Sequence, residues 1–195
     1  MIRLATPSQT IGPFFHRALL HEGWNDLDNL AARGAVGERV VIEGSVLDGD
    51  GAPVTDAMIE VWQANAAGRY DHPEDLKPSK PLDRNFQGFG RVATGPDGRF
   101  RLRTIKPGPV AGAGEALQAP HINVSIFARG LLKRLVTRIY FPGELLNETD
   151  ALLSALPTDR RDTLIARAVD AGAAERVLEF DIVLQGDNET VFLDV

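Results

Sequence analysis

The sequence predicts an all-β protein, a β-sandwich of about eight strands with an irregular N-terminal arm and two short helices near its C-terminal part. From Arg39 onward, short runs alternate apolar and polar residues with a period of two. Gly- and Pro-rich turns separate these runs at regular intervals. The length of 195 residues corresponds to a single domain, and 44% hydrophobic with 25% charged residues is typical of a folded globular chain.

The first 38 residues are expected to form an arm that packs on a partner subunit, and residues 39–195 are expected to form the sandwich domain. Gly12-Pro13 fits neither a helix interior nor a central strand. The run 24–33 has helical spacing of its apolar residues, and Gly34 is a suitable end for a short helix or turn. An arm with so little structure of its own usually packs on something else.

The strands are expected where the alternation is clearest. Pro96-Asp97-Gly98 is a turn sequence, so the two runs that flank it are expected to form a hairpin. In the second of these runs, Phe100 and Leu102 are expected to face inward, with arginines between them facing outward. The predicted strands cover a run from Arg39 that turns at Asp-Gly-Asp-Gly, 57–63, 91–94, 99–104, 121–129, 133–141, 176–186 and 189–195.

Two helices are predicted late in the chain. Asn147 is the expected cap of a helix that Pro157 ends. Thr158 is the expected cap of a second helix that Gly172 ends, with Leu164, Ile165, Ala168 and Val169 as its buried stripe. Residues 106–120 are rich in Gly, Pro and Ala, and are expected to be the longest loop outside the arm.

Composition excludes several classes of function. The chain has no cysteine, which excludes a disulfide framework, a thiolate metal site, a cysteine nucleophile and an iron–sulfur cluster. A net charge of −6 argues against non-specific nucleic-acid binding, which depends on neutralising phosphates. No stretch approaches the length of a membrane span, and the start has no signal-peptide pattern, so we expect a cytoplasmic protein. The four histidines share no metal-ligand spacing.

Long ordered motifs carry a resemblance to a known family. IEVWQANAAGRYDHP (59–73), NFQGFGRVATGPDGRFRLRTIKPGPV (85–110), APHINVSIFARG (119–130) and TRIYFPGE (137–144) follow one another at the distances seen in the intradiol ring-cleaving dioxygenases, and TPSQTIGPFF is similar to their N-terminal arm. The resemblance implies a sandwich fold and a role in opening an aromatic dihydroxy acid with dioxygen at a non-haem Fe(III). It is strongest to the subunit that does not bind iron in the two-subunit enzymes of the family.

The resemblance implies that this chain holds no iron. Catalytic subunits of the family bind Fe(III) with two tyrosines and two histidines, and the matching positions here are Tyr70, Val110, His121 and Asn123. Phenolate oxygen suits the hard ferric ion, whereas an isopropyl group cannot ligate and an amide oxygen is a weak, neutral ligand. Gln118 stands where the catalytic subunit has a substrate-handling arginine. The resemblance therefore places the Fe(III) in a homologous iron-binding partner subunit, with higher hetero-oligomers of such pairs.

The resemblance also implies which residues line the partner's pocket. These positions are Thr10, Gly12, Pro13 and Phe14 of the arm, and Arg129 after the strand 121–129. A guanidinium is the best bidentate partner for the carboxylate of a dihydroxybenzoate. Gly-Pro permits a close, stiff approach of the backbone to an aromatic ring.

Two other readings of the sequence remain open. A self-sufficient iron dioxygenase is disfavoured by Val110 and Asn123, and one tightly bound iron per purified chain would revive it. A non-catalytic sandwich binding module is disfavoured by the arm motif, because a bare module needs no pocket-lining arm. Co-purification with a larger relative that carries Tyr and His-x-His would distinguish these readings.

Overall fold

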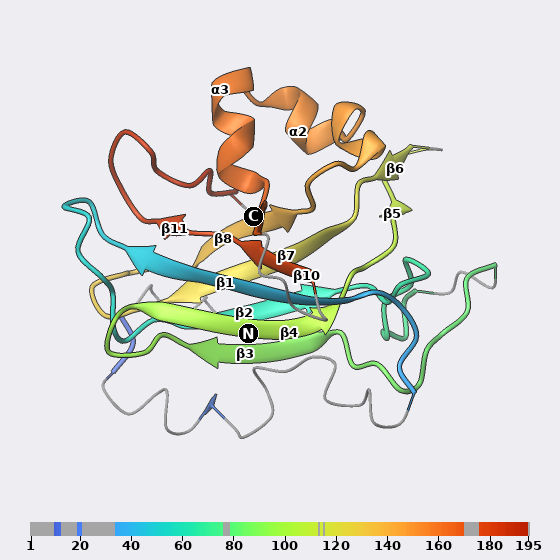
Figure 1. Ribbon diagram of the computed structural model, residues 1–195, viewed down its shortest axis with the longest axis horizontal. Helices are drawn as coiled ribbons and strands as arrows, with labels where there is room; N and C mark the ends of the chain where they lie inside the picture. The colour runs from blue at the N-terminus through green and yellow to red at the C-terminus, as the bar shows by residue number, and fades with distance from the viewer. Residues whose placement is uncertain are drawn as a thin grey trace, which may run out of the picture.

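A computed structural model describes residues 10–12, 19–20, 34–75, 79–112, 114, 116–169 and 176–194. Its described strands form two main sheets (Figure 1). In the first sheet, β1 (Arg39–Leu47) runs antiparallel to β4 (Arg99–Ile105) and parallel to both β10 (Arg176–Glu179) and β11 (Ile182–Val183). β9 (Arg167–Val169) continues this sheet beside β10 in the antiparallel sense.

The second sheet is antiparallel throughout. Its order is β3 (Phe89–Ala93), β2 (Met58–Gln63), β7 (His121–Phe127) and β8 (Leu135–Tyr140). Its inward-facing residues are β-branched, as in Ile59 and Val61 of β2 and Val124 of β7, each about 1% exposed. Such residues pack well on a pleated surface, so they favour strands at these positions.

One hydrophobic core lies between the sheets. From the first sheet it receives alternate residues, including Val40, Ile42, Phe100 and Leu102, all buried. Arg99, Arg101 and Arg103 of β4 are exposed, as the period of two predicts. The sandwich predicted from the sequence is therefore confirmed, and so is the orientation of β4.

The hairpin predicted around Pro96-Asp97-Gly98 is wrong. The turn itself exists, and Gly98 has the positive φ of 73° that such a turn requires. However, β3 pairs with β2 in one sheet and β4 pairs with β1 in the other. The turn is a corner between the two layers, because each strand pairs with a strand more distant in the sequence.

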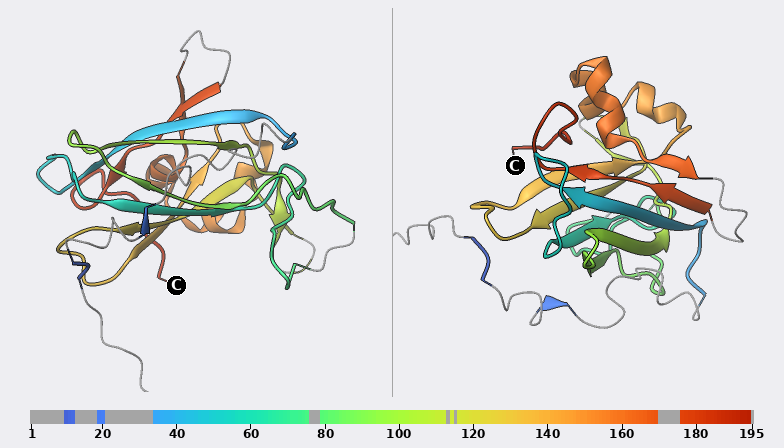
Figure 2. Two further views of the ribbon diagram at one scale, coloured as in Figure 1. Left: turned by 90° about the horizontal axis from the view of Figure 1, so that it is seen from below. Right: turned by 60° about the vertical axis from the view of Figure 1, so that its left-hand side comes forward.

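The C-terminal part contains two short helices, but their boundaries differ from the prediction (Figure 2). A 3₁₀ helix spans Leu145–Glu148, and Asp150 rather than Asn147 caps α2 (Ala151–Ala155). Pro157, rather than the predicted Thr158, is at the N-cap position of α3 (Thr158–Arg161). This helix passes into a 3₁₀ turn at Asp162–Leu164. Of the four residues predicted to form the buried stripe of the second helix, only Leu164 is buried in a helical turn.

Beyond that turn the chain is extended rather than helical. Ala168 and Val169 lie in the exposed edge strand β9, whose backbone pairs with β10, and Gly172 lies outside the described residues. The spacing of the apolar residues here is typical of a helix, but pairing of the backbone with a neighbouring strand determines the structure instead. The strand predicted at 189–195 is also wrong over residues 189–194, which form no regular strand although Leu193 N donates to Val136 O at 2.8 Å.

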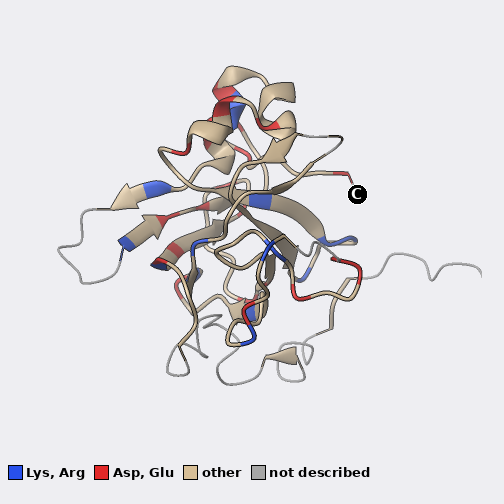
Figure 3. Ribbon diagram, turned by 90° about the vertical axis from the view of Figure 1, so that its right-hand side faces the viewer, with Lys and Arg blue, Asp and Glu red and all other residues tan. Residues whose placement is uncertain are grey.

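The segment 106–120 is not a plain loop. β5 (Val110–Ala111) and β6 (Leu117–Gln118) form a small antiparallel pair within it. Acidic and basic residues are interspersed along the ribbon in Figure 3, and in that view the basic residues are not gathered on one face. Among the described residues, no helix is long and apolar enough to cross a membrane.

Candidate functional site

Tyr70 lies in a tight loop after β2 that packs on the segment leading to Val110. The Asn65 side chain builds this loop, because its Oδ1 accepts hydrogen bonds from Ala67 N and Arg69 N, both at 3.0 Å. Gly68 has a φ of 77°, and a Cβ there would lie 2.0 Å from the carbonyl oxygen of Pro109. Glycine is therefore required where the two segments meet. The fold thus brings Tyr70 and Val110, the first two positions expected from the resemblance to match iron ligands, into neighbouring segments.

The other two ligand positions lie on β7. His121 and Asn123 are two residues apart, so they share the face of the sheet that points away from the core between the sheets. Asn123 Nδ2 donates to the hydroxyl oxygen of Tyr70 at 3.3 Å. The Tyr70 ring stacks on Trp62 with ring centres 5.7 Å apart. The side chains of Tyr70 and Asn123 are therefore in direct contact with each other.

Arg138 of β8 enters the same cluster from the neighbouring strand. Its Nε donates to Asn123 Oδ1 at 3.1 Å, and its Nη1 donates to Gln118 Oε1 at 2.8 Å and to the Tyr140 hydroxyl at 3.2 Å. The β7–β8 register places Arg138 opposite Asn123 and Tyr140 opposite His121. We call the group Tyr70, Gln118, His121, Asn123, Arg138 and Tyr140 the arginine cluster.

Burial and the arginine set the protonation of the cluster. Burial, with a smaller effect from the positive charge of Arg138, lowers the pKa of His121 to about 4, so the ring is neutral at neutral pH. Burial raises the pKa of Tyr140 to about 12 and also raises the pKa of Tyr70 above its ordinary value. His121 Nδ1 lies 2.8 Å from the Ala119 carbonyl oxygen, which only accepts, so Nδ1 carries the proton.

These residues do not fit a ferric site. Val110 is buried and offers no donor atom, and Asn123 offers only amide groups that are already hydrogen-bonded. Within the described part of the chain, no group of three or more His, Cys, Asp or Glu side chains could hold a metal ion. Two remaining ligands, Tyr70 and His121, are too few for a stable mononuclear centre.

Of the residues expected to line a partner's pocket, the structure places three. Thr10 Oγ1 accepts a hydrogen bond from Gly130 N at 3.0 Å, which holds this point of the arm beside Arg129. The Arg129 side chain is 66% exposed and forms an ion pair with Asp56. Gly12 is exposed, with open space where a Cβ would lie. Pro13 and Phe14 lie outside the described residues.

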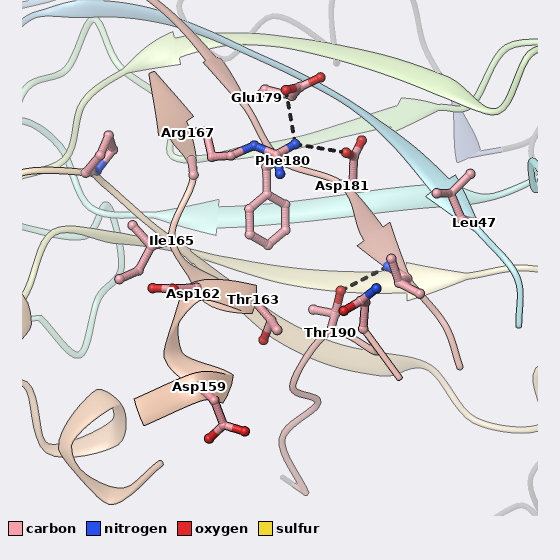
Figure 4. A pocket seen from close by; sticks show the side chains of 14 residues that line it. Leu47, Asp159, Asp162, Thr163, Ile165, Arg167, Glu179, Phe180, Asp181 and Thr190 are labelled. Atoms are coloured by element: carbon pink, nitrogen blue, oxygen red, sulfur yellow. Dashed lines mark hydrogen bonds and ion pairs between the residues drawn. The ribbon is translucent and has the colours of Figure 1, made fainter. Parts of the chain in front are cut away.

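A cavity of about 780 Å³ lies elsewhere, between the C-terminal turns and the first sheet (Figure 4). Four carboxylates and one arginine, Arg167, line it, and Arg167 Nη2 lies 3.1 Å from Glu179 Oε2 and 3.3 Å from Asp181 Oδ2. The cavity contains none of the predicted site residues, and its arginine is already paired. The cavity is therefore separate from the arginine cluster and from Arg129.

Sequence reasoning missed Arg138, Tyr140 and Asp150. Arg138 and Tyr140 alternate with Thr137 and Ile139 in the motif TRIYF, which is the pattern of a strand with one polar face. That face could have been matched to the polar face of His121 and Asn123. Asp150 gives no such signal, because its partners lie on three separate segments.

Comparisons with known proteins identify the family of the chain. Residues 11–186 match the family model described as Dioxygenase. The chain is 42% identical over 199 residues to the protocatechuate 3,4-dioxygenase alpha chain of Burkholderia cepacia, with 97% of each chain covered. Its structure is similar to the dioxygenase domain of a dioxygenase–carbohydrate-binding fusion from Streptomyces sp. SirexAA-E, with a TM-score of 0.62, 30% identity, and coverage of 93% of this chain and 98% of that one.

The chain therefore belongs to the dioxygenase family, in its intradiol ring-cleaving branch. Within this family it is similar along its whole length to alpha chains of protocatechuate 3,4-dioxygenase. It is also 46% identical over 160 residues to the beta chain of the same enzyme from Burkholderia cepacia, but that match covers only 80% of this chain and 68% of the beta chain.

Proposed function

We propose that this chain is the alpha, non-iron-binding subunit of a protocatechuate 3,4-dioxygenase. The complete enzyme opens protocatechuate between its two hydroxyl-bearing carbons with dioxygen, giving 3-carboxy-cis,cis-muconate. A homologous beta subunit holds the Fe(III), and this chain supplies part of the wall of the pocket above it. When bound there, Fe(III) activates the catecholate ring toward dioxygen.

This proposal rests on two findings taken together. The chain matches alpha chains along its full length, and two of its four ligand positions carry residues that cannot serve as good iron ligands. Val110 and Asn123 stand at two of four ligand positions, so the chain needs iron from elsewhere. The homologous beta chain shows that relatives occur as two different subunits. The self-sufficient dioxygenase and the unrelated binding module each account for only one of these two observations.

The proposed division of the chain is an arm, residues 1–38, that packs on the beta subunit, and a sandwich domain, residues 39–195. Thr10, Gly12, Pro13 and Phe14 of the arm and Arg129 line the shared pocket. The hydrogen bond from Gly130 N to Thr10 Oγ1 supports this grouping, because it ties the arm to the end of the strand that carries Arg129. We place the assembled enzyme, a higher oligomer of paired subunits, in the cytoplasm.

The experiment that tests the function is expression of this chain alone and together with its beta subunit. The chain alone is expected to show no ring cleavage and to self-associate, because a permanent interface of more than about 2,000 Å² would be left uncovered. Co-expressed, the two chains are expected to co-purify and to cleave protocatechuate. A monodisperse, active, iron-containing chain on its own would show the proposal to be wrong.

Arg129→Ala is expected to lower kcat/KM of the assembled enzyme for protocatechuate by about ten- to a hundredfold. A charge-assisted hydrogen bond to a carboxylate contributes roughly 1.5–3 kcal/mol. The iron content should stay unchanged, because Arg129 is not a ligand. The loss should be smaller for catechol, which lacks the carboxylate.

Asp56→Ala is the matched control for this prediction, because it removes the partner of Arg129 in this chain and leaves the guanidinium in place. It is expected to retain most of the activity. Equal losses of kcat/KM for catechol and protocatechuate would indicate that Arg129 interacts with negative charge on the ring oxygens rather than with the carboxylate. Unchanged kinetics for both substrates would leave Arg129 as a surface residue paired with Asp56.

A further inference from the structure

We infer that Arg138 excludes the ferric ion from this chain, so that restoring the two missing ligands does not restore a metal site while Arg138 is present. This goes beyond the proposed function, which requires only that the chain lack iron. It concerns a residue that stands at none of the four ligand positions. It also predicts that three changes, rather than two, separate this cluster from a metal centre.

The first step of the argument is the position of the guanidinium. Asn123, at the second histidine position, donates to the Tyr70 hydroxyl and accepts from Arg138 Nε at 3.1 Å. A histidine placed at 123 would therefore have the guanidinium within a few ångströms of its ring. Arg138 is held in that place by two further acceptors, Gln118 Oε1 and the Tyr140 hydroxyl.

The second step is charge. An arginine side chain in a protein cannot be neutralised by losing its proton, unlike lysine or histidine. Arg138 is partly buried, as are Tyr70 and Asn123, and screening by solvent is weak in such places. A trivalent cation bound at these residues would face a fixed positive charge at short range.

The third step is that the retained ligands are otherwise well placed. His121 Nδ1 is bound to the carbonyl oxygen of Ala119, and this is the arrangement that orients a metal-binding histidine to use its Nε2. Tyr70 is fixed by its stacking on Trp62. The obstacle that remains after ligand restoration is therefore the arginine rather than the orientation of these two side chains.

The test uses the full-length chain produced without an iron-binding partner, and ferric ion as the probe. Val110→Tyr with Asn123→His restores the ligand set, and a third variant adds Arg138→Gln, which removes the charge and keeps a hydrogen-bonding side chain. Bound iron is measured by metal analysis and by the visible absorption of tyrosinate bound to Fe(III). We expect well under about 0.1 equivalent in the double variant and about one equivalent in the triple variant.

Two matched variants of the same double background isolate the cause. Arg138→Lys keeps a positive charge, but one that can be lost with a proton, so it is expected to bind less iron than Arg138→Gln does. Arg134→Gln removes the same charge from an exposed position four residues away and is expected to have no effect. Stoichiometric iron in the double variant, or no gain from Arg138→Gln, would overturn the inference.

Tyrosine is larger than valine, so the variants at position 110 could lose their fold through overpacking. A second comparison avoids that change. Asn123→His is compared with Asn123→His plus Arg138→Gln, and Cu(II) is the probe because it binds histidine pairs most tightly among the first-row divalent ions. The inference predicts at least about tenfold tighter Cu(II) binding in the variant without Arg138. Equal affinities would contradict it.

Discussion

Replacing Asp150 by Ala is expected to lower the free energy of unfolding by about 4 kcal/mol, which is a large fraction of the net stability of a typical domain. Asp150 is fully buried and joins three segments. Its Oδ1 accepts from the Tyr140 hydroxyl at 3.0 Å and from Leu152 N and Leu153 N, while its Oδ2 accepts from Ala119 N at 2.9 Å. Alanine would leave these donors without their acceptor.

Asp150→Asn provides a graded comparison, because it keeps one oxygen for the helix and Tyr140 but turns an NH₂ group toward Ala119 N. It is expected to lose about half as much stability. Asp159→Ala, at an exposed position in α3, is the control and should change stability by well under about 1 kcal/mol. Urea unfolding of the purified complex or chain measures all three variants. Equal stabilities of Asp150→Ala and Asp159→Ala would refute the role of Asp150.

Acidification is expected to destabilise the fold through His121, by about 3 kcal/mol between pH 6.5 and pH 4. Burial and Arg138 lower the pKa of His121 from 6.5 to about 4, and the histidine is only 3% exposed. Between these two pH values the unfolded chain binds a proton that the folded chain does not. The stabilising effect is therefore complete above pH 6.5 and is lost progressively as the pH falls toward 4.

His121→Gln removes this titration, so its unfolding free energy should depend less on pH than that of the parent over this range. His72→Gln is the matched control, because it makes the same change at an exposed histidine outside the arginine cluster. Other groups also titrate in acid, so the informative quantity is the difference between variants at each pH. Parallel pH profiles for His121→Gln and the parent would rule out the buried neutral histidine.

The sandwich was predictable from the sequence because its strands have one buried face. β4 shows why, since its apolar and arginine residues alternate without exception up to Arg103. The sequence could not predict which sheet each strand joins. The corner at Pro96-Asp97-Gly98 has the local chemistry of a hairpin turn, and only the pairings of β3 with β2 and of β4 with β1 make it a crossover. Those pairings depend on contacts between distant residues.

The prediction of a second helix in the C-terminal part was wrong for a related reason. The spacing of Leu164, Ile165, Ala168 and Val169 satisfies a helical period, yet Tyr140 O accepts from Ala166 N at 2.9 Å and the chain continues into β9. Pairing with distant segments outweighed local propensity there. Short apolar runs are ambiguous in this way when no strong cap fixes the helix end.

The resemblance indicated four residues of the candidate site, but it did not indicate Arg138 among them. Tyr70, Val110, His121 and Asn123 could be assigned from the resemblance, and the fold does place Tyr70 against Asn123. Arg138 could not be assigned in that way, because it stands at none of these positions. Its place in the cluster follows from the β7–β8 register, which sets it opposite Asn123.

The central claim is that this chain works beside an iron-binding subunit without binding iron itself, and metal analysis of the assembled complex tests it most directly. Complexes are prepared with an intact beta subunit and with a beta subunit whose iron-binding tyrosines are replaced by phenylalanine. We expect about one iron for each pair of chains in the first complex and almost none in the second. Two irons for each pair, or iron that persists after the partner's tyrosines are removed, would contradict the claim.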